Sequence, residues 1–159
     1  MTEIRQLKFS DLPAALELCN EIREHHRQLL GGYFLPLDYD MEQENLKSFV
    51  IEDNKTAFLA LEDGQPAGML TAVVKYSPWL EKPNICHVDT LVVGRKFQRR
   101  GIAGRLMDEL LVFCREHQLE EVKLGVFNVN GGAVEFYRQY GFAPQEQKMS
   151  LNLEKTKND

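Results

Sequence analysis

The amino-acid sequence predicts an α/β domain, of the α+β kind, built around a mixed β-sheet. Segments with the period of strands alternate with segments of helical spacing, in the order strand, helix, helix, three strands, helix, strand, helix, strand. The strand expected over residues 85–93 is rich in branched residues, which is typical of a central strand, and a helix separates it from the next strand. The chain of 159 residues, 43% of them hydrophobic, is long enough for one core. We therefore expect one domain over residues 1–159.

The N-terminal third is predicted to contain one strand and two helices. Residues 2–9 alternate weakly between polar and apolar types and are expected to form a strand. Ser10 offers an N-cap for a helix over residues 12–30, and Gly31 with the glycine after it should end that helix. After an aromatic loop, residues 40–51 are expected to form a second, shorter helix.

The rest of the chain predicts a hairpin followed by two strand–helix units and a last strand. Asp63 and Gly64 begin a turn signal between two apolar segments, which indicates a β-hairpin. Beyond Gly101, apolar residues at helical spacing predict a strongly amphipathic helix. The expected elements are strands over residues 56–61, 67–76, 85–93, 122–127 and 147–153, and helices over residues 102–117 and 131–140.

Charge is unevenly distributed along the chain. The net charge is −5, yet residues 95–105 contain five basic side chains and no acidic one. A small cationic region suits a compact polyanion such as a phosphorylated cofactor, whereas the acidic remainder suits a cationic partner such as an amine. A globally acidic protein repels nucleic acid, so we expect no nucleic-acid partner.

Other features of the sequence argue against several classes of protein. The longest apolar runs are five residues, far below the ~20 that a membrane helix needs, so we expect no membrane span. The N-terminus lacks the pattern of a secretory signal. The cysteines Cys19, Cys86 and Cys114 are widely spaced, and we expect reduced, mostly buried thiols in a cytoplasmic protein. No group of residues has metal-ligand spacing, so no metal is expected.

A basic loop with glycines joins a buried strand to the amphipathic helix. Gly101 and Gly104 remove side chains where the first helical turn presents unpaired backbone N–H groups. Arg99 and Arg100 add charge-assisted donors. The loop predicts a phosphate site, although it is neither a Walker A loop nor a dinucleotide fingerprint, since Ala103 occupies the second glycine position. An exposed basic turn and an RNA-binding loop are the alternatives.

A second group of residues follows the next expected strand. Asn130 is expected to cap a helix that Gly141 ends, and Tyr137 lies two turns from its start. A tyrosine in this position packs against a core more often than it acts in catalysis. From the residues alone, both interpretations of Tyr137 stay open.

Together the two segments resemble the GNAT (Gcn5-related N-acetyltransferase) superfamily. The cofactor signature of that family, Gln/Arg-x-x-Gly-x-Gly/Ala, matches Gln98-Arg99-Arg100-Gly101-Ile102-Ala103. The downstream signature, Asn-x-x-Ala-x-x-x-Tyr followed by Gly-Phe, matches Asn130, Ala133, Tyr137 and Gly141-Phe142. The match is best over residues 85–153. The resemblance implies a twisted, mostly antiparallel sheet of six to seven strands flanked by about four helices.

The resemblance also implies acetyl-CoA as cosubstrate. The backbone of residues 91–93 would pair with the pantetheine arm, and N–H groups of residues 99–104 would hold the pyrophosphate. Asn130 would contact the pantetheine or a bridging water, and Tyr137 would lie near the thioester sulfur. The cofactor-binding residues expected on this basis are Leu91, Val92, Val93, Gln98, Arg99, Arg100, Gly101, Ile102, Ala103, Gly104, Asn130 and Tyr137.

The activity that the resemblance implies is direct transfer of an acetyl group to an amine. Tyr137, with an ordinary phenol pKa of about 10, would protonate the departing thiolate. An amine with a pKa near 10 needs a group that accepts or relays its proton. Asp89 is the favoured base, and His87, two residues away on the same face of the strand, is its rival. For both residues a purely structural role stays open.

The acceptor is expected to be a small, cationic amine or a peptide amine. His and aromatic side chains within residues 25–39 and 76–79 should rim its pocket, where cation–π contacts are available. The alternative function is a non-catalytic acyl-CoA-binding or regulatory domain of the same fold, which binds the cofactor without releasing its thiol. Similar proteins are often homodimers, although nothing in the sequence demands one.

Overall fold

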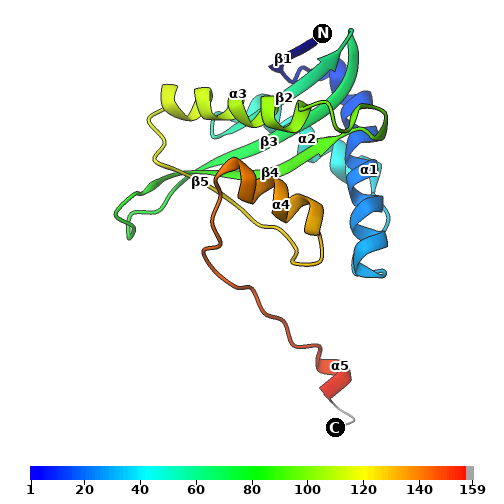
Figure 1. Ribbon diagram of the computed structural model, residues 1–159, viewed down its shortest axis with the longest axis vertical. Coiled ribbons are helices and arrows are strands. Elements are labelled where there is room, and N and C mark those ends of the chain that lie inside the picture. The colour runs from blue at the N-terminus through cyan, green and yellow to red at the C-terminus, as the bar shows by residue number, and fades with distance from the viewer. Residues whose placement is uncertain (157–159) are drawn as a thin grey trace.

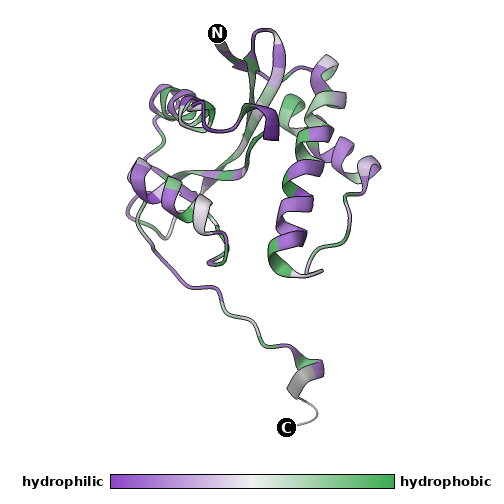
Figure 2. Ribbon diagram, turned by 45° about the vertical axis from the view of Figure 1, so that its right-hand side comes forward, coloured by the Kyte–Doolittle hydropathy of each residue, from purple (hydrophilic) through white to green (hydrophobic). Residues whose placement is uncertain are grey.

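A five-stranded sheet lies between two layers of helices in the computed structural model, which describes residues 1–156 (Figures 1 and 2). The strand order is β1-β2-β3-β4-β5, with antiparallel pairs up to β4 and a parallel pair between β4 and β5. The strands are β1 (Thr2–Gln6), β2 (Lys55–Glu62), β3 (Gln65–Tyr76), β4 (Asn84–Val93) and β5 (Glu121–Leu124). This confirms the predicted α/β class and the mixed, mostly antiparallel sheet. Residues 157–159 of the predicted domain lie outside the described residues.

Four helices of ten or more residues form the two outer layers. The helices α1 (Leu12–Leu30) and α2 (Tyr39–Ile51) cover one face of the sheet, and α3 (Ile102–Glu116) and α4 (Gly131–Tyr140) cover the other (Figure 2). Short helical segments occur at Phe9–Asp11, Arg95–Phe97 and α5 (Leu153–Thr156). None of the helices in residues 1–156 combines the length and the apolar character needed to cross a membrane.

The sheet divides the interior into two cores. Leu59 packs with α1 and α2 on one side, whereas its neighbour Phe58 packs with α3 on the other, because successive strand residues point to opposite faces. Leu16 and Leu46 are buried in the first core and Leu106 in the second. Each fully buried leucine contributes about 1.5–3 kcal/mol, so both layers of helices are fixed to the sheet.

The ends of the predicted helices agree closely with the structure, with one correction. Gly31 has a left-handed φ of 57° and ends α1, as expected. Ser10 is not the N-cap of α1, because it lies inside the short helix Phe9–Asp11. The Asp11 carboxylate instead accepts the Lys8 backbone N–H at 2.8 Å and two N–H groups of Arg5 at 2.8 and 2.9 Å. Asp11 thereby joins β1 to the start of α1.

Replacing Asp11 with asparagine is expected to lower the free energy of unfolding by about 1 kcal/mol, because charge-assisted hydrogen bonds to Arg5 are lost. Arg5 holds the pKa of Asp11 below its ordinary value. The stabilisation is therefore present above the unfolded-state pKa near 4 and disappears as pH falls through the lowered native pKa. Urea denaturation at pH 7 and pH 3 measures both effects. The exposed pair Glu44–Lys47 is the control, and Glu44→Gln should change stability by less than ~0.5 kcal/mol.

The sheet has five strands, rather than the six to seven predicted. Residues 147–153 do not form the expected last strand; they are extended away from the domain up to the start of α5 (Figure 1). A strand needs a neighbouring strand to pair with, and residues 147–152 belong to no strand of the sheet in the part of the chain described. The first and fifth strands are also shorter than expected, ending at Gln6 and Leu124.

The three cysteines are buried free thiols, which confirms that part of the sequence prediction. The thiols of Cys86 on β4 and Cys114 on α3 contribute to the same core. Cys19 lies in the opposite core, on α1. The cytoplasmic location stays a prediction.

Candidate functional site

A β-bulge interrupts β4 at Asp89. On β3 the neighbouring residues Thr71 and Ala72 face Thr90 and Val88, so Asp89 is the extra residue of the longer strand. The bulge changes which residues face which core. Val88 and Leu91 both pack in the α3 core although three positions separate them, which strict alternation does not allow. Bulges of this kind redirect side chains beside functional sites.

The bulge coincides with the place where β4 and β5 separate. Residues 85–88 of β4 pair with β5, whose last paired residue is Leu124. Along residues 89–93, no strand from the described part of the chain pairs with that edge of β4. Leu91, Val92 and Val93 thus lie on an open edge of the sheet. Backbone N–H and C=O groups on this edge can pair with an extended ligand, which would bind as an added strand.

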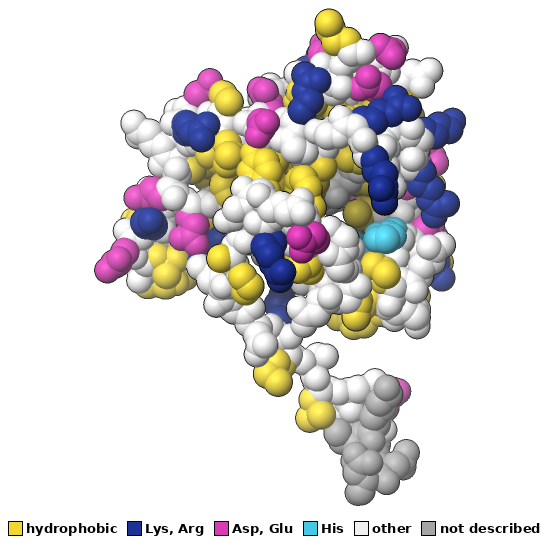
Figure 3. Space-filling view, in the orientation of Figure 1, with side chains coloured by type: hydrophobic (Ala, Val, Ile, Leu, Met, Phe, Trp, Pro, Cys, Tyr) yellow, Lys and Arg dark blue, Asp and Glu magenta, His cyan; other side chains and the backbone are white. Residues whose placement is uncertain are grey.

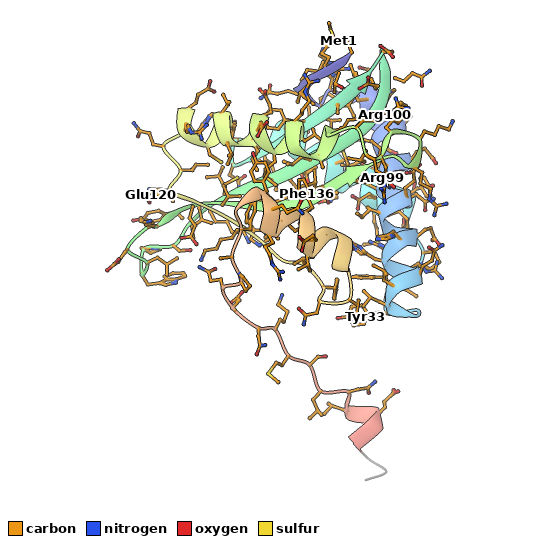
Figure 4. The ribbon with its side chains drawn as sticks, in the orientation of Figure 1. Met1, Tyr33, Arg99, Arg100, Glu120 and Phe136 are labelled. Atoms are coloured by element: carbon orange, nitrogen blue, oxygen red, sulfur yellow. The ribbon has the colours of Figure 1, made fainter. Side chains whose placement is uncertain are left out.

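The loop between β4 and α3 presents the start of the helix to solvent. Arg99 and Gly101 have left-handed φ values of 63° and 76°, and Gly101 is the N-cap without a side-chain cap. The first N–H groups of α3 are therefore left for another acceptor. A Cβ atom built on Gly104 would meet nothing within 4 Å, so the space over the first turn is open. Arg99 and Arg100 lie on this loop, at the end of α3 nearest α1 (Figure 4).

The basic residues of this region do not all belong to the loop. Arg105 donates to the backbone carbonyl of Thr2 at 2.9 Å and is tied to β1. The Arg100 guanidinium lies 5.6 Å from the ring centre of Phe97. Lys and Arg side chains gather on the side of the molecule where α3 begins (Figure 3). The structure therefore leaves Arg95, Lys96, Arg99 and Arg100 as the exposed cations of the loop.

A cavity of about 460 Å³ lies between the helical layers, beside the bulge. This size is in the range of small-molecule sites. It brings together four of the predicted site residues, namely Asp89, Leu91, Asn130 and Tyr137, with residues of α1, α2 and the segment after β5. The other lining residues are Cys19, Ile22, Arg23, His26, Phe34, Leu37, Glu42, Asn45, Thr90, Gly125, Val126, Phe127 and Ala133.

Two carboxylates line the cavity, Glu42 from α2 and Asp89 from β4. Glu42 accepts a hydrogen bond from the Cys19 thiol at 3.4 Å and one from the Asn45 side chain at 3.3 Å. Burial raises the pKa of Cys19, and the negative charges of Glu42 and Asp89 raise it further. The thiol therefore stays protonated. At the Cys19 sulfur the carboxylates of Glu42 and Asp89 are opposed by the guanidinium of Arg23, so two negative charges against one positive charge favour a cation on this side of the cavity.

Helix α4 contributes Asn130 and Tyr137. The Asn130 side chain accepts the Ala133 N–H at 3.4 Å, which confirms the predicted N-cap. The Tyr137 ring packs against Phe142, with ring centres 5.6 Å apart. Burial raises the pKa of Tyr137, and no hydrogen bond holds its hydroxyl among the described residues. A protonated phenol thus lines the cavity with its donor unused.

Aromatic rings form one rim of the cavity. His26, Phe34 and Phe127 lie within about 6 Å of one another, centre to centre, and join α1 to the loops after α1 and β5. Burial lowers the pKa of His26, as do the nearby His25 and Arg23, so its ring is neutral at pH 7. This agrees with part of the predicted rim.

Other predicted positions lie outside this cavity. Tyr76 and Trp79 do not line it; they lie at the turn between β3 and β4 and are 67% and 79% exposed. His87 is half-buried on β4 and is not a lining residue. Burial, followed by nearby Lys75, lowers the pKa of His87. The catalytic roles given to Asp89, His87 and Tyr137 stay predictions.

Sequence reasoning missed the residues that α1 and α2 contribute. Glu42, Arg23 and Cys19 line the cavity, but each belongs to an ordinary amphipathic pattern in the sequence. The Arg23 guanidinium lies 5.4 Å from the ring centre of Phe34 and donates to the Leu35 carbonyl at 3.1 Å. Only the packing of α1 against α2 brings these side chains to the cavity.

Known proteins are similar to this chain in sequence. The sequence model of the acetyltransferase (GNAT) family matches residues 18–142. The streptothricin acetyltransferase of Streptomyces lavendulae is 34% identical over 91 residues, which are 57% of this chain and 46% of the relative. The chain spans about half the length of the curated relatives it matches.

Solved structures share the fold. A mutant of the BH1408 protein from Bacillus halodurans superposes with a TM-score of 0.87 at 19% identity, covering 95% of this chain and 99% of that chain. The aminoglycoside N-acetyltransferase AAC(6')-Iy in complex with CoA gives a TM-score of 0.76 at 18% identity, covering 96% of this chain and 94% of that chain. At these identities the likeness concerns the fold alone.

Proposed function

Because the chain belongs to the acetyltransferase (GNAT) family, we propose that it transfers the acetyl group of acetyl-CoA directly to a primary amine of a small molecule or peptide. The observation that carries this proposal is one cavity that combines an open strand edge, a protonated tyrosine and two carboxylates. The alternative, an acyl-CoA-binding domain without catalysis, shares the strand edge but has no use for the other groups.

Three features of the chain fit acetyl-CoA. The first turn of α3 offers unpaired N–H groups and the positive end of a helix dipole to the pyrophosphate. The open space at Gly104 lets a phosphate approach that backbone. The free edge of β4 at residues 91–93 can pair with the amide groups of pantetheine. The thioester supplies the activated acetyl group.

The opposite side of the cavity suits a cationic amine. Asp89 and Glu42 supply negative charge, and the neutral His26 and Phe34 supply apolar and π-face contacts. Asp89 is the proposed base, directly or through a water molecule, because it lines the cavity whereas its rival His87 does not. The similarity to a streptothricin acetyltransferase supports an amine acceptor.

Proton transfer and electrostatics complete the proposed reaction. The amine nitrogen attacks the thioester carbonyl after losing a proton toward Asp89. Backbone N–H groups of β4 at the bulge stabilise the oxyanion. The C–S bond then breaks, and Tyr137, kept protonated by its raised pKa, gives its proton to the thiolate.

The test combines cofactor binding with a screen of amines. Acetyl-CoA should raise the midpoint of thermal unfolding, and free CoA thiol should appear with a member of a panel of polyamines, aminoglycosides, amino acids and peptides. Binding without thiol release over the whole panel would favour the non-catalytic alternative. Neither binding nor release would contradict both functions.

Replacing each of the two carboxylates by itself should distinguish the role of Asp89 from that of Glu42. Asp89→Asn is expected to lower kcat about 10²–10⁴-fold, because the amine keeps its proton. Glu42→Gln is expected to raise KM for a cationic amine about tenfold with kcat nearly unchanged, because one attractive charge is lost. Steady-state kinetics measure both. Asp53, which is exposed and outside the cavity, provides the control substitution Asp53→Asn. Equal effects from all three variants would contradict the assignment.

A further inference from the structure

Helix α1 lines one wall of the cavity with side chains of different character. Cys19, Arg23 and His26 follow one another at intervals of four and three residues, so they lie on the same face of the helix. From Cys19 to His26 the helix rises by roughly 10 Å. A small molecule that lies along α1 therefore meets one set of groups at the Cys19 end of the cavity and another at the His26 end.

The Cys19 end is negative. Glu42 accepts the hydrogen bond of the Cys19 thiol at 3.4 Å, and the negative charge of Asp89 acts on the same thiol. Among the described residues that line the cavity, these two carboxylates and the Arg23 guanidinium are the charged groups at pH 7, because His26 is neutral. Two negative charges and one positive charge leave a net charge of −1, which a single ammonium group balances.

The His26 end is aromatic and partly open to solvent. The rings of Phe34 and Phe127 lie within about 6 Å of the His26 ring, centre to centre. Tyr33 lies 5.0 Å from Phe34 and 5.8 Å from Phe127, after the end of α1 and beside the loop that precedes α4 (Figure 4). Phe127 is 37% exposed and Tyr33 67%. Such rings can stack on a flat apolar group.

Arg23 places a positive charge beside the aromatic end. Its guanidinium lies 5.4 Å from the ring centre of Phe34 and donates to the Leu35 carbonyl at 3.1 Å. Arg23 also contributes to the lowered pKa of His26, so its charge acts on that end of the cavity. A second ammonium group there would be repelled, whereas an aromatic ring is attracted to a guanidinium.

We propose that the acceptor is an amine with one positive charge and an aromatic group, and that Arg23 excludes polycations. This inference rests on the proposed function. The ammonium group binds at the Cys19 end, and the aromatic group lies among the rings of His26, Phe34 and Phe127. In phenethylamine a short linker joins the ammonium group to one ring, so this amine is the simplest probe.

The proposed reaction balances for such an amine. Its nitrogen forms the amide bond as the thioester C–S bond breaks. One proton of the ammonium group leaves through Asp89, and a second replaces the proton that Tyr137 gives to the thiolate. The products are the amide, the CoA thiol and one proton.

Binding of defined amines tests the proposal without any reaction. Calorimetric titrations use the protein with CoA and the protein alone. Phenethylamine should bind at least about tenfold more tightly than butylamine, which has no ring, and than spermidine, which has several ammonium groups. Equal or tighter binding of butylamine or of spermidine would overturn the proposal. Phenylalanine adds a carboxylate to phenethylamine, and its tighter binding would show that Arg23 binds an anion, which would overturn the proposal as well.

Two variants test the assigned residues. In Arg23→Gln the ratio of phenethylamine to spermidine affinity should fall at least about tenfold, because the repelling charge is lost. Phe127→Leu should weaken phenethylamine about tenfold and butylamine less than about twofold. Tyr76→Leu, at an exposed ring outside the cavity, is the control and should change neither amine. An unchanged ratio in Arg23→Gln would contradict the role of Arg23, and equal losses for both amines in Phe127→Leu would contradict the aromatic site.

Failure of this proposal and failure of the proposed function give different results. Thiol release from acetyl-CoA with spermidine or butylamine but not with phenethylamine would leave the acetyltransferase function intact and overturn the aromatic acceptor. Tight binding of phenethylamine without thiol release from any amine would support the aromatic site and count against the proposed catalysis.

Discussion

Replacing Tyr137 with phenylalanine is expected to lower kcat about 10²–10⁴-fold while acetyl-CoA affinity changes less than about twofold. The phenol is the proposed acid for the thiolate, and its ring keeps its packing against Phe142 in the variant. Stability should change little, since no described residue hydrogen-bonds the hydroxyl. Thiol release and calorimetric titration of acetyl-CoA measure the two parameters.

The same helix provides the control for this prediction. The Tyr140 hydroxyl donates to Asp108 at 2.5 Å, and Tyr140 does not line the cavity. Tyr140→Phe should therefore leave kcat within about threefold. If Tyr137→Phe kept full activity, the proton would come from another group. Because burial raises the pKa of Tyr137, loss of its proton should reduce wild-type activity only above about pH 10.

Substitutions at Gly104 are expected to change stability and cofactor affinity in opposite directions. Gly104 lies in the first turn of α3 with an ordinary φ, and a Cβ there meets no protein atom within 4 Å. Gly104→Ala should raise the free energy of unfolding by about 0.5–1 kcal/mol, because alanine loses less backbone entropy. Acetyl-CoA affinity should fall roughly 10–100-fold, since the methyl group displaces a phosphate from its backbone donors.

Urea denaturation without ligand and calorimetric titration measure these two changes. Gly132, in the first turn of α4, has an ordinary φ and open space as well, but does not line the cavity. Gly132→Ala should thus be neutral or stabilising without changing affinity. Unchanged affinity in Gly104→Ala would show that no phosphate approaches this turn, and would contradict the proposed cofactor site.

The sequence predicted best those features that depend on neighbouring residues. The boundaries of α4 agree because Asn130 caps it and Gly141 ends it, and both signals are local. Helix α1 ends as predicted for the same reason, at Gly31. The loop before α3 was predicted from its glycines and arginines, and its open helix end is seen in the structure. These elements need no tertiary contact to be recognised.

Features that depend on distant residues were not predicted. The pattern of residues 147–153 indicates a strand, yet a strand forms only beside another strand, and the described sheet ends at β5. Glu42 lines the cavity because α2 packs against α1, and no spacing in the sequence indicates this. The bulge at Asp89 arises from the pairing of β3 with β4, and the sequence of β4 alone does not show which residue is the extra one.

That bulge makes the length of β4 as important as its composition. Before Asp89 the even-numbered residues of β4 face the α3 core, whereas after Asp89 the odd-numbered residues do. Val88 and Leu91 therefore share one core, while Val92 lies in the other. If one residue were deleted here, β3 and β4 would pair as a regular ladder, with Val88 and Leu91 two positions apart. No extra residue would then be directed at the cavity. Natural variation in this strand should accordingly exchange residues other than Asp89 more readily than it inserts or deletes one.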